Sequence, residues 1–245
     1  MSPDLPAAPP WIEDLPRDSR GYPVPAEAGW QDGHPLLKVV ATDRKVALGM
    51  RRACAVCGYQ IPKGATVYRA WAQGDAAHMR MYEREQSHDM GGPLHYSCII
   101  YSTMACPYLR EKRSRLGKDS KVNPGARRGS LAAVMGFRDF GILVYAQPHQ
   151  FLHDDAPPPQ FAYLGLVDDI PYRDGEEIAN RYAEAVESDS QIIETSRPRL
   201  YWTDREDDLK ALATTLRSDF RTLEKAEPAY SQVIVGVGRY VAFPM

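Results

Sequence analysis

Apolar residues recur at helical spacing in two stretches of the first half of the chain. Residues 42–50 open on a threonine suited to cap a helix, and Val46 and Met50 lie one turn apart. Residues 94–106 form a second apolar stretch, which we expect to end at Cys106 because the proline that follows disfavours the helical conformation. Two helices are therefore expected here.

The second half of the chain carries two more helix signals, each of which resembles a capping box. Residues 174–177 read Asp-Gly-Glu-Glu and precede an apolar face that includes Ile178 and Ala185. Residues 203–206 read Thr-Asp-Arg-Glu and precede the most regular apolar stripe of the chain, which consists of Leu209, Leu212, Leu216, Phe220 and Leu223. We expect a long amphipathic helix at this second position.

Strand patterns are interspersed with these helices. Alternation or short apolar runs predict strands at residues 66–71, 140–146 and 161–167, and a closing strand at residues 232–243 with a bulge at one of its glycines. Residues 73–92 are polar and rich in glycine, histidine and methionine, which predicts a long loop. The mixture of segregated helices and strands indicates the α+β class.

Changes in composition divide the chain into four parts. Proline density in residues 1–30 blocks helix and ladder hydrogen bonds and predicts an extended arm, whose aromatic residues hold it against the body. Residues 110–130 are basic and contain an Asn-Pro-Gly turn, as a linker would. The expected organisation is a proline-rich arm at 1–30, a zinc-binding domain at 31–109, a basic linker at 110–130 and a small α+β domain at 131–245.

All four cysteines fall in one window, and three of them have the spacing of metal ligands. Cys54 and Cys57 form a CxxC motif, and after 37 intervening residues His95 and Cys98 form an HxxC motif. A CxxC turn supplies two thiolates, and residues three apart in the first turn of a helix point to the same side. The sequence therefore predicts a structural Zn²⁺ ion held by Cys54, Cys57, His95 and Cys98 in a treble-clef-like domain. Four protein ligands leave no position for a catalytic water molecule.

Cys106 is the alternative ligand. It lies eight residues beyond Cys98, which in a continuous helix is about 12 Å along the axis and too far to share the ion. It replaces His95 only if the helix breaks early. Buried or disulfide-bonded cysteines without a metal are the remaining interpretation.

Several motifs together carry a family resemblance. The start at residues 11–25 (WIEDLPRDSRGYPVP), the CxxCG at 54–58, the HxxC at 95–98 and the Cys-Pro at 106–107 resemble a family of uncharacterised bacterial and phage-encoded proteins. The resemblance covers most of the N-terminal half, except for the polar insert at 58–92. It implies a zinc-binding fold and no established activity. The CxxC, Ile-Pro-Lys and HxxC order is also similar to the zinc fingers of poly(ADP-ribose) polymerases, which recognise DNA breaks.

The distribution of charge suggests a partner. The net charge is −2, but residues 31–130 carry 17 Lys and Arg against 8 Asp and Glu, whereas residues 154–208 carry 5 against 15. A basic region beside a zinc site favours contacts to phosphates. The candidate nucleic-acid-binding residues are Arg110, Lys112, Arg113, Arg115, Lys118, Lys121, Arg127 and Arg128.

The leading hypothesis is a non-enzymatic zinc protein that binds nucleic acid or a nucleoprotein partner. One alternative is a protein–protein adaptor, related to phage proteins, that acts through the acidic C-terminal half. The other is a metal-dependent nuclease, suggested by the loop histidines. Neither a signal peptide nor an apolar run long enough for a transmembrane helix is present in the sequence, so we expect a cytoplasmic protein without a membrane partner.

Overall fold

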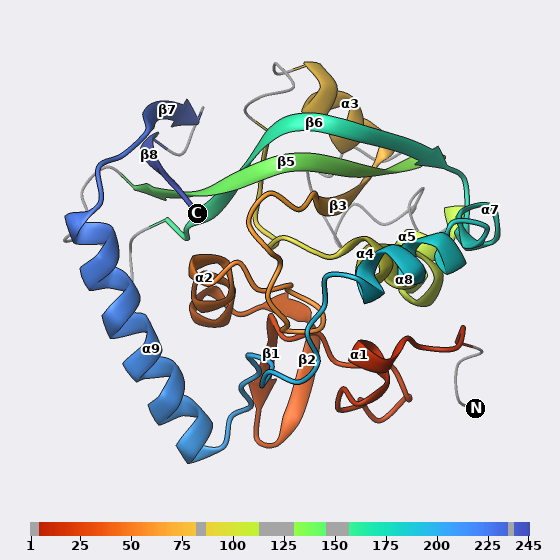
Figure 1. Cartoon of the computed structure of the whole chain (residues 1–245), viewed down its shortest axis with the longest axis horizontal. Helices are drawn as coiled ribbons and strands as arrows, with labels where there is room; N and C mark the ends of the chain where they lie inside the picture. The colour runs from red at the N-terminus through yellow and green to blue at the C-terminus, as the bar shows by residue number, and fades with distance from the viewer. Residues whose placement is uncertain (1–4, 82–86, 113–129, 146–156, 235–237) are drawn as a thin grey trace.

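The computed structural model describes residues 5–81, 87–112, 130–145, 157–234 and 238–245, and it has the α+β class that the sequence predicts. Figure 1 shows its main feature, a long antiparallel ribbon that crosses the molecule above most of the helices. No helix of the described residues is long and apolar enough to cross a membrane.

The ribbon consists of β5 (Ala132–Tyr145) and β6 (Gln160–Tyr172), which pair along most of their length. The other edge of β5 is shared by two strands. Its first half pairs with β3 (Val67–Ala72), and its last residues pair with β8 (Gly238–Pro244). The sheet is completed by β4 (Ser87–Asp89) beside β6 and by β7 (Tyr230–Ile234) beside β8.

Nearly every side chain of β5 is buried, which explains why it is longer than the sequence predicts. A strand covered on both faces has no alternation of apolar and polar residues to mark its start. The expected strand at 140–146 is therefore only the second half of β5. Strand β6 is also longer than expected and continues past residue 167 to Tyr172, although its second half is partly exposed.

A two-stranded hairpin lies apart from the main sheet. It joins β1 (Ala28–Gln31) to β2 (His34–Val40) through Asp32 and Gly33. Both turn residues have positive φ angles, 52° and 76°, which suits the Asp-Gly pair that favours tight hairpin turns. This hairpin was not among the predicted elements, although its Asp-Gly signal is present in the sequence.

The helices confirm most of the predictions from periodicity. Residues 42–50 form α2, residues 96–105 form α4 and residues 206–225 form α9, each where a helix was expected. The described helices are α1 (Pro10–Glu13), α2 (Thr42–Met50), α3 (Gln73–Met81), α4 (Tyr96–Ala105), α5 (Pro107–Arg110), α7 (Gly175–Ala179), α8 (Tyr182–Ser190) and α9 (Glu206–Lys225).

Three local predictions were wrong. The expected loop at 73–92 contains α3 and β4, because Ala76 and Met79 of its first turns are buried in the core. The helix expected from residue 174 is broken into α7 and α8 at Asn180 and Arg181. The closing strand is two antiparallel strands, β7 and β8, and β8 begins at Gly238 with a φ of +111°.

One hydrophobic cluster connects both halves of the chain. It contains Trp11 and Ile12 of the proline-rich arm, Ile99 of α4, Phe137 of β5 and Phe243 of β8. The arm is thus packed against the body, as its aromatic residues predicted. The segments assigned to two domains, 31–109 and 131–245, share this cluster and the main sheet.

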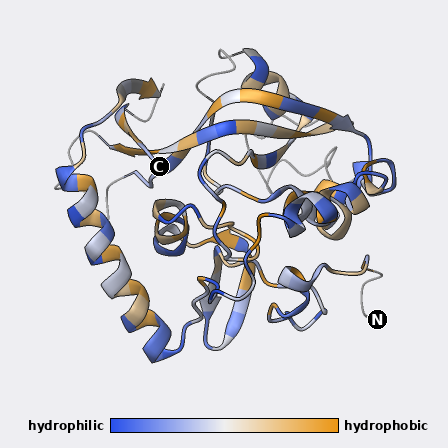
Figure 2. Ribbon diagram, in the orientation of Figure 1, coloured by the Kyte–Doolittle hydropathy of each residue, from blue (hydrophilic) through white to orange (hydrophobic). Residues whose placement is uncertain are grey.

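The long helix α9 packs along α2. Leu212 of α9 lies in a small cluster with Leu48 and Trp202, and Asp219 of α9 forms an ion pair with Arg51 at 2.6 Å. Figure 2 shows apolar and polar residues alternating along α9, as expected for a helix with one buried face. The main cluster also includes Leu223 near the C-terminal end of this helix.

We predict that the proline-rich arm is part of the cooperative fold. Ile12→Ala should lower the free energy of unfolding by about 2–5 kcal/mol, because it leaves a cavity in the core. The matched variant Glu13→Ala changes an exposed residue of the same short helix and should stay within about 0.5 kcal/mol of wild type. Urea unfolding measures both, and equal small effects would contradict the packing of the arm.

Candidate metal centre

The CxxC motif lies on a tight turn. The Gly58 N–H donates to the Cys54 carbonyl at 2.9 Å, and the Cys54 N–H donates to the Tyr59 carbonyl at 2.8 Å. Gly58 has a φ of +75°, and a Cβ at this position would lie 2.2 Å from the Leu200 carbonyl oxygen. Only glycine allows both this backbone angle and this close contact with Leu200. The turn and the packing of Leu200 therefore require a glycine after the CxxC motif.

The other two candidate ligands lie at the start of α4. His95 is the N-cap residue, with extended backbone angles, and Cys98 lies in the first turn. Backbone hydrogen bonds align this segment with the turn: the Ala55 N–H donates to Pro93 at 2.9 Å, and the Tyr68 N–H of β3 donates to Leu94 at 2.9 Å. The two ligand pairs are therefore held together by the backbone as well as by their own side chains.

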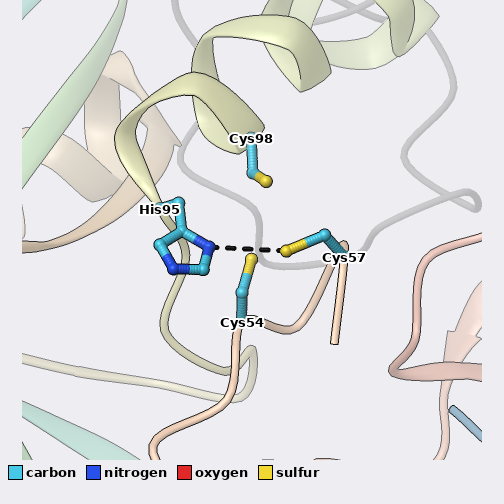
Figure 3. A group of neighbouring side chains, drawn as sticks. All are labelled: Cys54, Cys57, His95 and Cys98. Carbon is cyan, nitrogen blue, oxygen red and sulfur yellow. Dashed lines mark hydrogen bonds between the residues drawn. The ribbon is translucent and has the colours of Figure 1, made fainter. Parts of the chain in front are cut away.

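The structure brings together the four residues that the sequence predicts, Cys54, Cys57, His95 and Cys98. Their candidate ligand atoms all lie within 4.8 Å of one another, and each residue is at most 1% exposed. Figure 3 shows Cys54 and Cys57 of the turn, with His95 and Cys98 at the start of α4, pointing toward a common centre. This group of three sulfurs and one nitrogen could hold a metal ion.

The orientation of the imidazole is set by a backbone carbonyl. Nδ1 of His95 lies 3.4 Å from the Cys57 sulfur, and Nε2 lies 3.3 Å from the Gln60 carbonyl oxygen. A hydrogen on Nε2 donated to this carbonyl leaves the lone pair of Nδ1 directed at the three sulfurs. Metal-ligating histidines are typically oriented in this way by a partner on the other ring nitrogen.

Burial and mutual contact shift the pKa values of the clustered thiols in opposite directions. Burial raises the pKa of Cys98 well above its ordinary value, and the neighbouring cysteines raise it further. For Cys54, burial is outweighed by hydrogen bonds from Cys57 and Cys98 and by the charge of His95, so its pKa lies well below the usual value. A divalent cation removes this conflict, because it stabilises all three thiolates at once.

A second layer of contacts fixes the start of α4. Asp189 of α8 is 2% exposed, and it accepts hydrogen bonds from both the backbone N–H of Ser97, at 2.6 Å, and the Ser97 hydroxyl. The Trp11 indole donates to the same hydroxyl at 3.0 Å. Burial raises the pKa of Asp189, while the Ser97 hydrogen bonds and the charge of His95 oppose that rise. The carboxylate thus caps α4 from outside the helix.

A group of charged side chains braces the loop that leads into His95. The Gly92 N–H donates to Glu27 at 3.1 Å, and Arg69 donates to the Gly92 carbonyl at 3.1 Å. Arg69 also pairs with Asp89 at 3.1 Å. Burial raises the pKa of Glu27, and the charge of Arg69 opposes that rise. The loop is therefore held by β3, by β4 and by the residue that precedes β1.

The structure places the remaining predicted residues elsewhere. Cys106 is the C-cap residue of α4, is partly exposed and lies outside the four-residue group. Of the basic candidates, Arg110 is half-buried at the end of α5 and Lys112 is exposed. The other six, Arg113, Arg115, Lys118, Lys121, Arg127 and Arg128, lie outside the described residues.

Sequence reasoning missed the residues that support the ligands. Ser97 lies inside the HxxC motif, where a serine near the start of a helix could have been expected to form a capping contact. The partner carboxylate, Asp189, lies 92 residues further on in an acidic helix and has no distinguishing signal. Gln60 acts through its backbone carbonyl, which residue type does not reveal.

The fold and the four buried residues define an α+β protein with a candidate metal centre. No family model matches the chain, and neither a curated protein nor a solved structure matches it. The resemblance to bacterial and phage-encoded zinc-binding proteins therefore stays a prediction from the motifs.

We predict that a bound metal protects three of the four cysteines. A chromogenic aryl disulfide reagent should titrate one thiol in the native protein, the partly exposed Cys106, and all four after chelation and denaturation. Fast reaction of more than one thiol in native protein with a full complement of metal would contradict this assignment. Cys106→Ser should then have no rapidly reacting thiol.

Proposed function

We propose that the chain is a zinc-binding protein and that the surface beside its metal centre binds nucleic acid. The observation that carries the zinc assignment is the closed group of three thiols and one imidazole, all buried, with ligand atoms within 4.8 Å of one another. Sulfur and nitrogen ligands in a set of four are typical of structural zinc, and hard cations such as Mg²⁺ prefer oxygen. The ligands of the ion are Cys54, Cys57, His95 and Cys98.

The local architecture supports a treble-clef type of site. One ligand pair lies on the turn at 54–58, and the other lies at the start of α4. Strand β3, which lies between the two pairs in the sequence, is bridged through Tyr68 to Leu94, the residue before His95. A turn followed by a strand and a helix N-terminus is the arrangement expected from the motif spacing. The ion has a structural role in this proposal, because four protein ligands leave no position for water.

The zinc assignment predicts different effects for two cysteine substitutions. Cys98→Ser should lose the metal and most of the fold, since structural zinc sites contribute about 10–16 kcal/mol of apparent binding free energy. Cys106→Ser should keep one zinc per chain and a wild-type melting temperature, because Cys106 lies outside the group. Elemental analysis and thermal unfolding measure both. Loss of zinc from Cys106→Ser, or its retention by Cys98→Ser, would contradict the ligand set.

The nucleic-acid part of the proposal rests on where the basic residues lie relative to the metal. The ligand helix α4 ends at Ala105, and α5 follows directly. The basic run begins at Arg110, which is the last residue of α5. Residues 31–130, which surround both ligand pairs, carry an excess of nine positive charges. A basic segment anchored to a rigid metal-bound helix is suited to contact phosphates.

We predict that this binding depends on salt and on the basic run. Wild-type protein should bind DNA or RNA with an affinity that falls as salt rises. Replacing the eight basic residues at 110–128 with glutamine should weaken binding. The slope of the logarithm of the binding constant against the logarithm of the salt concentration should become shallower by about 0.7–0.9 for each phosphate that is no longer neutralised. The control variant, Lys210→Gln with Lys225→Gln, removes exposed charges from α9 and should bind like wild type. Unchanged binding by the eight-residue variant would contradict the proposal.

The two alternatives have less support from the described residues. The adaptor hypothesis uses the acidic half, but Asp168 accepts a hydrogen bond from Tyr68 at 2.8 Å and Asp169 pairs with Arg80 at 2.6 Å, so both are engaged within the fold. The nuclease hypothesis needs a second or an open metal site. In the described part of the chain the closed cysteine and histidine group is the one cluster found that could hold a metal.

The proposed zinc site requires three reduced thiols. Clustered cysteines stay reduced in the cytoplasm, where they bind metal more often than they form disulfides. We therefore also propose a cytoplasmic location.

A further inference from the structure

A groove of about 380 Å³ opens beside the metal centre. Its walls come from five segments that the fold brings together: the proline-rich arm, β2, the CxxC turn, α4 and α5. The volume lies within the roughly 300–1,000 Å³ of typical ligand sites. The groove therefore has the size of a binding site for a small organic group.

The lining of the groove includes both aromatic and cationic side chains. Three tyrosines contribute, namely Tyr22 of the arm, Tyr101 of α4 and Tyr108 of α5. Tyr101 is 2% exposed. The guanidinium of Arg20 lies 5.2 Å from the centre of the Tyr22 ring, and it remains largely exposed although Asp18 pairs with it at 2.8 Å. Lys38 of β2 is exposed beside them.

Charge distinguishes this groove, called the tyrosine groove below, from two other hollows of the described surface. The hollow next to Gln60 contains Arg51 and Arg197, but an acidic residue, Glu194, also lines it. The hollow between β6 and α8 is lined by Asp168, Asp169 and Glu184 with a single arginine. None of the described lining residues of the tyrosine groove is acidic.

We propose that the tyrosine groove binds an unpaired base of single-stranded nucleic acid, an inference that rests on the proposed function. Aromatic side chains stack on the face of any base, and nearby cations hold the phosphates on either side of it. Arg20 and Lys38, both exposed lining residues, supply those cations. Bases of a duplex are already stacked and paired, so the groove should favour single strands.

The position of the groove links it to the metal. Val56, between the two cysteines of the turn, and Tyr101, about one turn after Cys98, both line it. The basic run begins just beyond Tyr108, so a strand that leaves the groove meets Arg110 and Lys112 next. The ion thus holds in place the surfaces that would contact the base.

The first experiment compares strand forms by fluorescence anisotropy with zinc-loaded protein. Wild type should bind a short oligothymidylate more tightly than a duplex of the same length. Tyr108→Leu should weaken single-strand binding by roughly 5- to 150-fold, the cost of losing one stacked base, and leave duplex binding unchanged. Tyr108→Phe keeps the ring and should retain wild-type affinity. Lys38→Gln should weaken binding moderately, and the distant control Lys225→Gln should not.

The second measurement uses Cys106, which also lines the groove. In the zinc-loaded protein it should be the reactive thiol, and saturating oligothymidylate should slow its reaction with a maleimide several-fold, whereas duplex should not. The groove inference is wrong, while the proposed function stands, if three results are found together. Both strand forms bind equally, Tyr108→Leu keeps wild-type single-strand affinity, and oligothymidylate leaves the rate of the Cys106 reaction unchanged. If neither form binds, both are wrong.

Discussion

The contact between the CxxC turn and the start of α4 constrains the rest of the structure. It joins Cys57 to His95, 38 positions apart, and closing such a loop costs conformational entropy that a metal ion would offset. The loop contains β3, α3 and β4. Of these, β3 pairs with β5 and β4 pairs with β6, on opposite sides of the ribbon. The ligand pairs therefore hold both ends of a segment that supplies two strands of the main sheet.

The start of α4 is also where distant segments converge. Ser97 lies between the two helix ligands and contacts Trp11, 86 residues earlier, and Asp189, 92 residues later. These contacts join the proline-rich arm and α8 to the same turn of helix that carries Cys98. The buried carboxylate faces the helix N-terminus, where the macrodipole stabilises negative charge. This convergence gives a physical reason why arm, metal centre and C-terminal half form one core.

The sequence predicts the parts of this structure that depend on neighbouring residues. Motif spacing identified the four clustered residues but left Cys106 as an alternative ligand, which the structure places outside the group. Apolar periodicity located α2, α4 and α9. The sequence did not predict that β3 pairs with β5, from which the basic segment at 110–130 separates it along the chain. Strand partners are set by packing and not by local pattern. The local increase in charge and turn residues at 110–130 predicted a linker, and the pairing of β3 with β5 joins the segments on either side of it. The Asp189 contact was missed for the same reason.

The proposed zinc ion is bound by three sulfurs and one imidazole nitrogen. X-ray absorption at the zinc edge measures this coordination directly in the purified protein. We predict three sulfur neighbours at about 2.3 Å and one nitrogen at about 2.0 Å, with the outer-shell scattering of an imidazole ring. A fit to four sulfurs, which would bring in Cys106, or to two or more light-atom neighbours, which would open the site to water, would contradict this coordination.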